Sequence, residues 1–198
     1  NSPHNGIEFT NSDMRPIDGN GDRVDGTTDI GDADNRFKDL YLSGGAYIGG
    51  TINANKLDDY ETGTWSPEYG GTTSQPTVSY NIQVGLYTKI GDFVQVQGRV
   101  RTASVSGGGG CLEIKNLPFT TNSTSNSFSA VNIAYASDWT TNNFPSTGYT
   151  NANTTTARLI KYNSSDPRAA RTTSLNVSDL NTGVGDNDIL FSIQYMTS

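Results

Sequence analysis

Residue types that commonly carry out catalysis are scarce in this chain. It has a single histidine, His4, and a single cysteine, Cys111. A Ser–His–Asp or Cys–His device would have to use His4, and nothing in the sequence brings it near Cys111 or a serine. One His and one Cys are also too few ligands for a zinc site in one chain. The sequence therefore favours neither a nucleophilic hydrolase nor a zinc enzyme.

Acidic residues offer a second route to catalysis. Asp58, Asp59 and Glu61 cluster in the sequence, and a pair of carboxylates can cleave a glycosidic bond. However, neighbouring side chains on a strand point to opposite faces, so proximity in sequence does not bring two carboxylates together. We interpret the cluster as a solvated acidic turn and predict that the protein is not an enzyme. A capsular polysaccharide depolymerase is the alternative.

Asp18, Asn20 and Asp22 place oxygen ligands at alternate positions, as at the start of a calcium-binding loop. The EF-hand pattern is incomplete, because Arg23 stands where the loop needs glycine and Asp29 stands where a bidentate Glu is usual. Asp, Asn and Gly also favour turns without any metal, so we interpret the segment as a solvated turn. We expect no cofactor, with Ca²⁺ at these three residues as the alternative.

A long polar segment, residues 138–153, combines aromatic side chains with amides. Aromatic faces stack on the C–H-rich faces of sugars, and Asn, Asp and Thr supply hydrogen bonds. We therefore predict that this loop and its neighbour bind a glycan, with packing of the aromatic rings between subunits as the alternative. The candidate ligand-binding residues are Trp139, Asn142, Asn143, Phe144, Tyr149, Asp166 and Arg168.

The segments that would position these loops have the pattern of β-strands. Val94, Val96 and Val100 alternate with polar residues, which predicts a half-buried antiparallel strand. The glycines at 107–110 predict a loop, followed by a returning strand at 111–115. Further strands are predicted over 77–84, 86–90, 128–135, 155–162 and 189–196, with Val78, Tyr80, Ile82 and Val84 on one face and Gly85 as an end or a bulge. The predicted fold is all-β, an antiparallel sandwich with jelly-roll-like connections.

The composition predicts that several copies share one core. Hydrophobic residues make up 33 % of the 198 residues, and a monomer with so few would bury too little surface to offset chain entropy. Apolar residues are sparsest over 1–55, which we interpret as a short intertwined trimeric shaft, with 56–198 as the head. Cys111 has no partner for an intrachain disulfide and is interpreted as a small buried residue, with a reactive or intermolecular thiol as the alternative.

The charge and hydropathy of the chain exclude two classes of partner. A net charge of −7 argues against a nucleic-acid surface, which needs clustered Lys and Arg. No apolar run approaches the ~20 residues that a membrane span requires, so no membrane insertion is expected. The first residue is Asn1, and we expect this chain to be an internal fragment of a longer one.

Parts of the sequence resemble a known family. GLYTKIGDFVQVQGRV (85–100), followed by LEIKNLPF (112–119), resembles the C-terminal β-sandwich module of bacteriophage tail-fibre and related virion proteins. Upstream, DGTTDIGDADNRFKDLYLSGGAYIGGT (25–51) and KLDDYETGTWSPEYGG (56–71) resemble the segments that join shaft and head in tail fibres of phages of marine and other aquatic bacteria.

The resemblance implies a homotrimeric virion protein that lies outside the cell and binds the surface of its host. Its expected partners are other copies of itself, a host polysaccharide or other receptor, and other virion tail proteins through a missing N-terminal part. Three tethered heads would convert weak single sites into strong attachment. The first alternative is a purely structural head, which caps the fibre or attaches to another virion protein without binding a receptor.

Overall fold

The computed structural model describes residues 4–52, 55–57, 59–163 and 171–197. The chain divides into two compact units, Asn1–Gly44 and Gly45–Ser198. The division into a shaft of residues 1–55 and a head of residues 56–198 stays a prediction. The described residues contain no α-helix, and among them no helix has the length and apolarity needed to cross a bilayer.

The first unit consists of one short hairpin and a series of turns. β1 (Gly6–Phe9) pairs antiparallel with β2 (Met14–Ile17), and the Thr10 N–H donates to Asp13 O over 2.9 Å to close the hairpin turn. No described residue of 4–44 is buried. Its exposed large apolar side chains are Ile7, Phe9, Met14, Ile30, Phe37, Leu40, Tyr41 and Leu42. The described part of this unit therefore has no apolar core of its own.

The second unit begins with a two-residue pairing and continues as one large antiparallel sheet. β3 (Ala46–Tyr47) pairs with β4 (Lys56–Leu57). The strands of the large sheet are β5 (Tyr60–Trp65), β6 (Glu68–Gly71), β7 (Thr77–Ile90), β8 (Phe93–Ser106), β9 (Leu112–Lys115), β10 (Ala130–Ser137), β11 (Thr147–Thr150), β12 (Ala157–Asn163), β13 (Arg171–Ser174) and β14 (Asp186–Met196), with a 3-10 turn, η2 (Val177–Asp179), before β14. This confirms the predicted all-β class.

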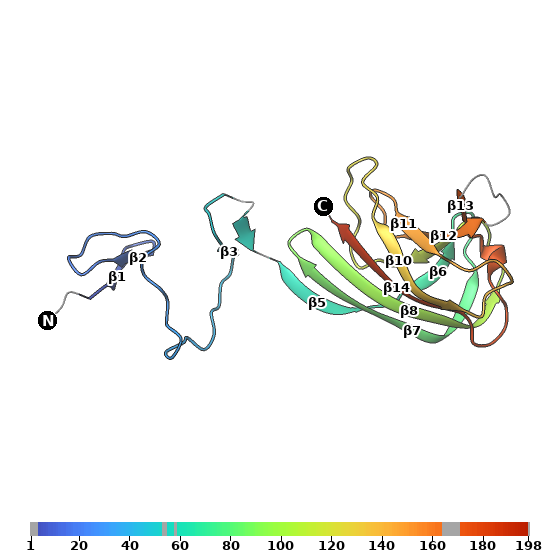
Figure 1. The fold of residues 1–198 in the computed structure, drawn as a ribbon, viewed down its shortest axis with the longest axis horizontal. Helices are drawn as coiled ribbons and strands as arrows, with labels where there is room; N and C mark the ends of the chain where they lie inside the picture. Colours follow the sequence, from blue (N-terminus) through green and yellow to red (C-terminus); the bar gives the residue numbers. More distant parts are fainter. Residues whose placement is uncertain (1–3, 53–54, 58, 164–170, 198) are drawn as a thin grey trace. The chain divides into compact units, whose positions relative to one another are not determined.

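The sheet curls so that its two ends face each other across the core. Its strand order is β5-β7-β8-β14-β10-β11-β12-β9-β6, with β13 paired to β12. Figure 1 shows the long strands β7 and β8 and the shorter β5 curving on one side of the unit, with β6, β11 and β12 on the other. The buried Tyr69 hydroxyl on β6 donates to Asn187 O on β14 over 2.7 Å, which ties the β6 end of the sheet to a central strand across the core. The result is a sandwich-like arrangement made from one curled sheet. The jelly-roll connections stay a prediction.

The core follows the predicted alternation on the strands at the centre of the sheet. Val94, Val96 and Val100 on β8 are fully buried, whereas Gln95 and Gln97 between them are exposed. On the neighbouring β14, the buried side chains are Ile189, Phe191, Ile193 and Tyr195. Cys111, predicted to be buried, is half-buried instead, because it precedes β9 at the end of the glycine loop.

The prediction for residues 77–90 was wrong in two respects. These residues form one continuous strand, β7, rather than two short strands. The pairing register with β8 shifts on both sides of Tyr80, so the alternation does not continue unchanged through the strand. Tyr80 therefore packs against the core, whereas Val84 is 56 % exposed and Leu86 is 45 % exposed.

A row of two glycines and two aromatic residues crosses four strands just after the register shift at Tyr80. The pairing places Trp65, Gly85, Gly98 and Phe191 side by side on β5, β7, β8 and β14. The Trp65 and Phe191 rings meet edge to face, with centroids 6.1 Å apart. A Cβ atom on Gly98 would lie 2.7 Å from Phe191 Cζ, and one on Gly85 would collide with the Trp65 indole. The two glycines therefore make room for the two rings inside the curled sheet.

We expect Gly98→Ala to destabilise the second unit by about 1–3 kcal/mol, because the added methyl group must displace a buried ring. Urea unfolding followed by circular dichroism at one fixed protein concentration measures this loss. Gly44→Ala is the control, since a Cβ atom at Gly44 meets nothing within 4 Å, and its effect should stay within about 0.5 kcal/mol. Equal unfolding midpoints for the two variants would contradict the close packing at Gly98.

Candidate functional site

The loop that joins β10 to β11 is held in place by polar contacts to the segments around η2 and β14. The Asn187 N–H donates to Asp138 O over 3.0 Å, and the Thr140 hydroxyl donates to Asp179 O over 2.7 Å. Asp138 and Asn142 have φ angles of 60° and 64°, a left-handed conformation that Asp and Asn tolerate well. The loop is thus a fixed structure that can present side chains.

Trp139 serves mainly to anchor this loop. Its indole Nε1–H donates to Asp188 O over 3.3 Å, and its ring lies edge-on to that of Tyr69, with centroids 5.8 Å apart. Burial raises the pKa of the Tyr69 hydroxyl well above its ordinary value, so that the hydroxyl stays a hydrogen-bond donor to Asn187 O. Trp139 is half-buried and packs against the core, which leaves only part of its ring accessible to a ligand.

Three of the predicted ligand-binding residues share one shallow surface hollow. Trp139, Asn142 and Phe144 line a hollow of about 200 Å³, together with hydroxyl-bearing residues of the same loop. The Phe144 side chain is 53 % exposed, so it is the most accessible aromatic ring in this hollow. An exposed ring beside amides and hydroxyls is the arrangement that suits a sugar.

The structure places the other candidates elsewhere. Asn143 lies in the loop, but its Oδ1 accepts a hydrogen bond from Lys161 Nζ over 2.5 Å, and Lys161 also contacts Asp179 Oδ2 at 3.0 Å. Tyr149 on β11 does not line the hollow; its ring lies beside Phe128, with centroids 5.8 Å apart. Asp166 and Arg168 lie outside the residues that the structure describes.

The predicted calcium residues are engaged with one another. Asp18 Oδ1 accepts hydrogen bonds from the backbone N–H groups of Asn20 at 2.8 Å and Asp22 at 2.9 Å. These bonds lower the pKa of the Asp18 carboxyl below its ordinary value. Within the described ranges, no group of three His, Cys, Asp or Glu side chains is placed to hold a metal ion. Calcium at Asp18, Asn20 and Asp22 stays the untested alternative to the expected absence of a cofactor.

Two residues of the predicted acidic cluster, Asp59 and Glu61, have structural partners, and Asp58 lies outside the residues that the structure describes. The Asp59 carboxylate pairs with Lys89 Nζ, whose side chain is nearly buried. The Glu61 carboxylate accepts a hydrogen bond from the Tyr87 hydroxyl over 3.0 Å, which raises the pKa of Tyr87. These contacts attach β5 and the residue before it to β7.

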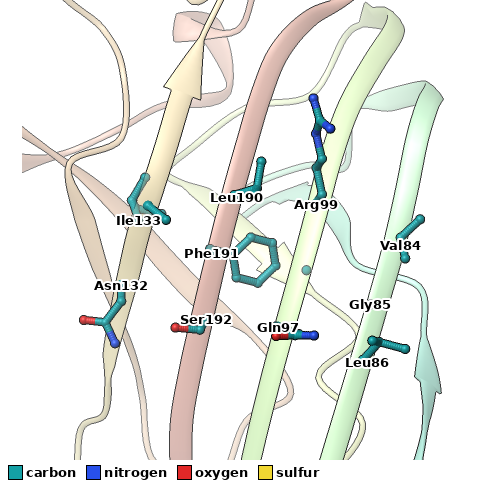
Figure 2. A pocket seen from close by; sticks show the side chains of 12 residues that line it. Val84, Gly85, Leu86, Gln97, Arg99, Asn132, Ile133, Leu190, Phe191 and Ser192 are labelled. Atoms are coloured by element: carbon teal, nitrogen blue, oxygen red, sulfur yellow. The ribbon is translucent and has the colours of Figure 1, made fainter.

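A larger groove, which was not predicted from the sequence, lies on the side of the sheet that faces away from the core. One part of it, about 470 Å³, runs over β7, β8, β14 and β10 (Figure 2). A second part, about 510 Å³, runs over β5, β7 and β8, and Leu86 and Gln97 line both. The outward direction of Gln97 was readable from the alternation. That of Val84 and Leu86 was not, because the register shift beside Tyr80 turns them outward.

Comparison with known proteins gives one likeness of fold. No family model and no curated protein matches the chain. Among solved structures, it is similar to the crystal structure of the Dettilon tailspike protein, with a TM-score of 0.51 and 19 % identity over 69 % of this chain. The chain spans about a quarter of that protein, covering 23 % of its length. At this identity the likeness is one of fold.

Trp139→Ala should destabilise the protein by about 2 kcal/mol or more, because it removes the ring contact with Tyr69 and the bond to Asp188. Phe144→Ala should change the stability by less than about 0.5 kcal/mol, since its ring is exposed. Urea unfolding followed by circular dichroism compares the two variants without relying on tryptophan fluorescence. A loss in Phe144→Ala as large as that in Trp139→Ala would show that Phe144 is also an anchor.

Proposed function

We propose that this chain is part of a homotrimeric bacteriophage tail protein, a tail fibre or tailspike, that attaches the virion to the surface of its host. The observation that carries the proposal is the similarity of its fold to a phage tailspike protein. The tail-fibre resemblance of residues 25–51, 56–71, 85–100 and 112–119 supports the same class. Such a protein works outside the cell as part of the virion, where other tail proteins would be its partners.

The state of residues 4–44 supports association of several copies. None of the described residues in this range is buried, and eight of its large apolar side chains are exposed. Exposed apolar side chains at this density are stabilised when chains wind together and cover them. A trimer meets this need, because three chains wound together share one apolar axis.

The hollow beside Phe144 is the proposed contact with the host. Its single exposed aromatic ring lies next to Asn142, Thr140 and Thr141, which together offer a stacking surface and hydrogen-bonding groups for a glycan. A shallow site of this size binds weakly by itself. Three sites on one particle gain affinity because the second and third contacts form at a high effective concentration.

We further propose that attachment does not involve cleavage of the glycan. The carboxylates of Asp59 and Glu61 are engaged by Lys89 and Tyr87, and the hollow beside Phe144 is lined by one acidic residue, Asp138. A glycosidase of the usual kind needs two carboxyl groups on either side of the scissile bond. Incubation with capsular polysaccharides, followed by sizing of the chains, tests this point. Shortened chains would replace the proposal with a depolymerase.

Phe144→Ala should weaken binding to glycan arrays and to host cells roughly tenfold, since it removes a stacked aromatic ring without unfolding the protein. Tyr162→Ala is the matched control, because its ring is similarly exposed, at 55 %, and does not line the hollow. Equal binding by both variants would contradict the proposed site. If the wild-type protein binds no glycan and no cell, the head is a structural cap.

A further inference from the structure

We propose that the side of β5, β7, β8, β14 and β10 that faces away from the core packs against the same side of neighbouring copies of this chain. We call this side the outer face. The proposal rests on the proposed homotrimer and assigns the surface that holds its heads together. Four rows of side chains make up the outer face, and each row crosses the strands at right angles.

The two flanking rows are rich in exposed apolar side chains. At one end, Tyr60, Ile90, Phe93 and Met196 form a row on four strands, exposed by 67 %, 41 %, 39 % and 48 %. The row at the other end consists of Val84, Arg99, Leu190 and Tyr135. Between residues 59 and 197, eight of the twelve exposed large hydrophobic side chains that the structure describes lie on the outer face; the other four are Phe128, Phe144, Tyr162 and Val184.

The two middle rows consist mainly of polar side chains, and none of these side chains is charged. One consists of Thr62, Thr88, Gln95 and Gln194, and the other of Thr64, Leu86, Gln97, Ser192 and Asn132. Each hydroxyl or amide is both a donor and an acceptor, so it can form a hydrogen bond with its own counterpart in another copy. Residues that lie on a threefold axis meet their own counterparts in the other copies, and such groups are therefore compatible with a position on the axis.

Charge is nearly excluded from these rows. The only charged side chain in them is that of Arg99, whose Nε and Nη2 donate to the two carboxylate oxygens of Asp188 over 3.0 and 2.7 Å. The Asp188 side chain is only 4 % exposed, so the pair offers a neutralised guanidinium rather than a free cation. Three like charges brought together at an axis would repel, and this face avoids that cost.

The groove gives the outer face a shape into which a neighbour's side chains can fit. Figure 2 shows Val84, Leu86 and Leu190 around the strip where Gly85 and the neighbouring β8 backbone leave the sheet uncovered. The four rows cover about 20 Å by 19 Å, since residues rise about 3.4 Å along a strand and strands lie about 4.8 Å apart. That is roughly 400 Å² of flat sheet per copy, below the ~800 Å² of a standard interface side. The outer face therefore adds to the contacts of the shaft rather than replacing them.

Thiol labelling of the assembled protein tests which side of the sheet is covered. Gln97 is exposed in the single chain and lies at the centre of the outer face. In a Cys111→Ser background, a Gln97→Cys variant should react with a bulky maleimide at least tenfold more slowly than a Val184→Cys variant. Val184 is 79 % exposed on the loop before β14 and lies outside the four rows. Equal labelling rates in a particle of trimer mass would overturn the proposal.

A charge placed on the outer face gives an independent measurement. Leu86→Lys should lower the urea concentration at which the trimer dissociates, as measured by analytical ultracentrifugation, because three lysines would be brought together. Val184→Lys is the matched control and should leave that concentration unchanged. An unchanged midpoint in Leu86→Lys, with both variants folded by circular dichroism, would overturn the proposal.

The outcomes separate this proposal from the proposed function. A wild-type protein of monomer mass overturns both the trimer and the outer-face contact. A trimer in which Gln97→Cys is labelled freely is consistent with the proposed function and overturns the outer-face contact. If a glycan slows the labelling of Gln97→Cys in such a trimer, the outer face is a ligand site. A trimer with a protected outer face and no binding to cells supports the contact and overturns host attachment.

Discussion

The second unit depends on two aromatic rings that occupy the space left by two paired glycines. Trp65 and Phe191 meet over Gly85 and Gly98 in one row that crosses four strands. A side chain at either glycine would push the rings out of the core. Because the row lies inside the curl, the same packing that fills the interior also limits how closely the two ends of the sheet can approach. The bond from the Tyr69 hydroxyl to Asn187 O holds the β6 end of the sheet against the central strand β14.

The fold illustrates which features of a strand can be read from sequence. The buried positions alternate along the middle of β8 and from Ile189 to Tyr195 on β14, and Val94, Val96 and Val100 were predicted correctly. The outward position of Val84 was not predictable, because Val78, Tyr80, Ile82 and Val84 alternate in sequence as if no residue were skipped. Only the pairing with β8 reveals the shift beside Tyr80. A bulge is a property of two strands, whereas periodicity describes one.

The loop site shows the same limit for polar residues. Residue types alone identified a segment with exposed rings and amides, and Trp139, Asn142 and Phe144 do share a hollow. They could not show that Trp139 is an anchor or that the Asn143 amide is bonded to Lys161. Both facts depend on strands distant in sequence, β12 and β14, that approach only in the folded unit. The sequence therefore indicated which residue types gather in this loop, but not which of them stay free.

The strand order has a consequence for how the protein is made. β14 lies between β8 and β10 in the sheet, although its residues follow both in the chain by a long interval. While a ribosome is still producing the residues before β14, the long β7–β8 hairpin has no partner on one of its edges, and its buried valines face water. Sheet closure must then wait for translation to reach β14, and such long-range pairing is slow to form. During that delay the free edge of β8 can pair with strands of other chains, which makes aggregation a hazard of synthesis.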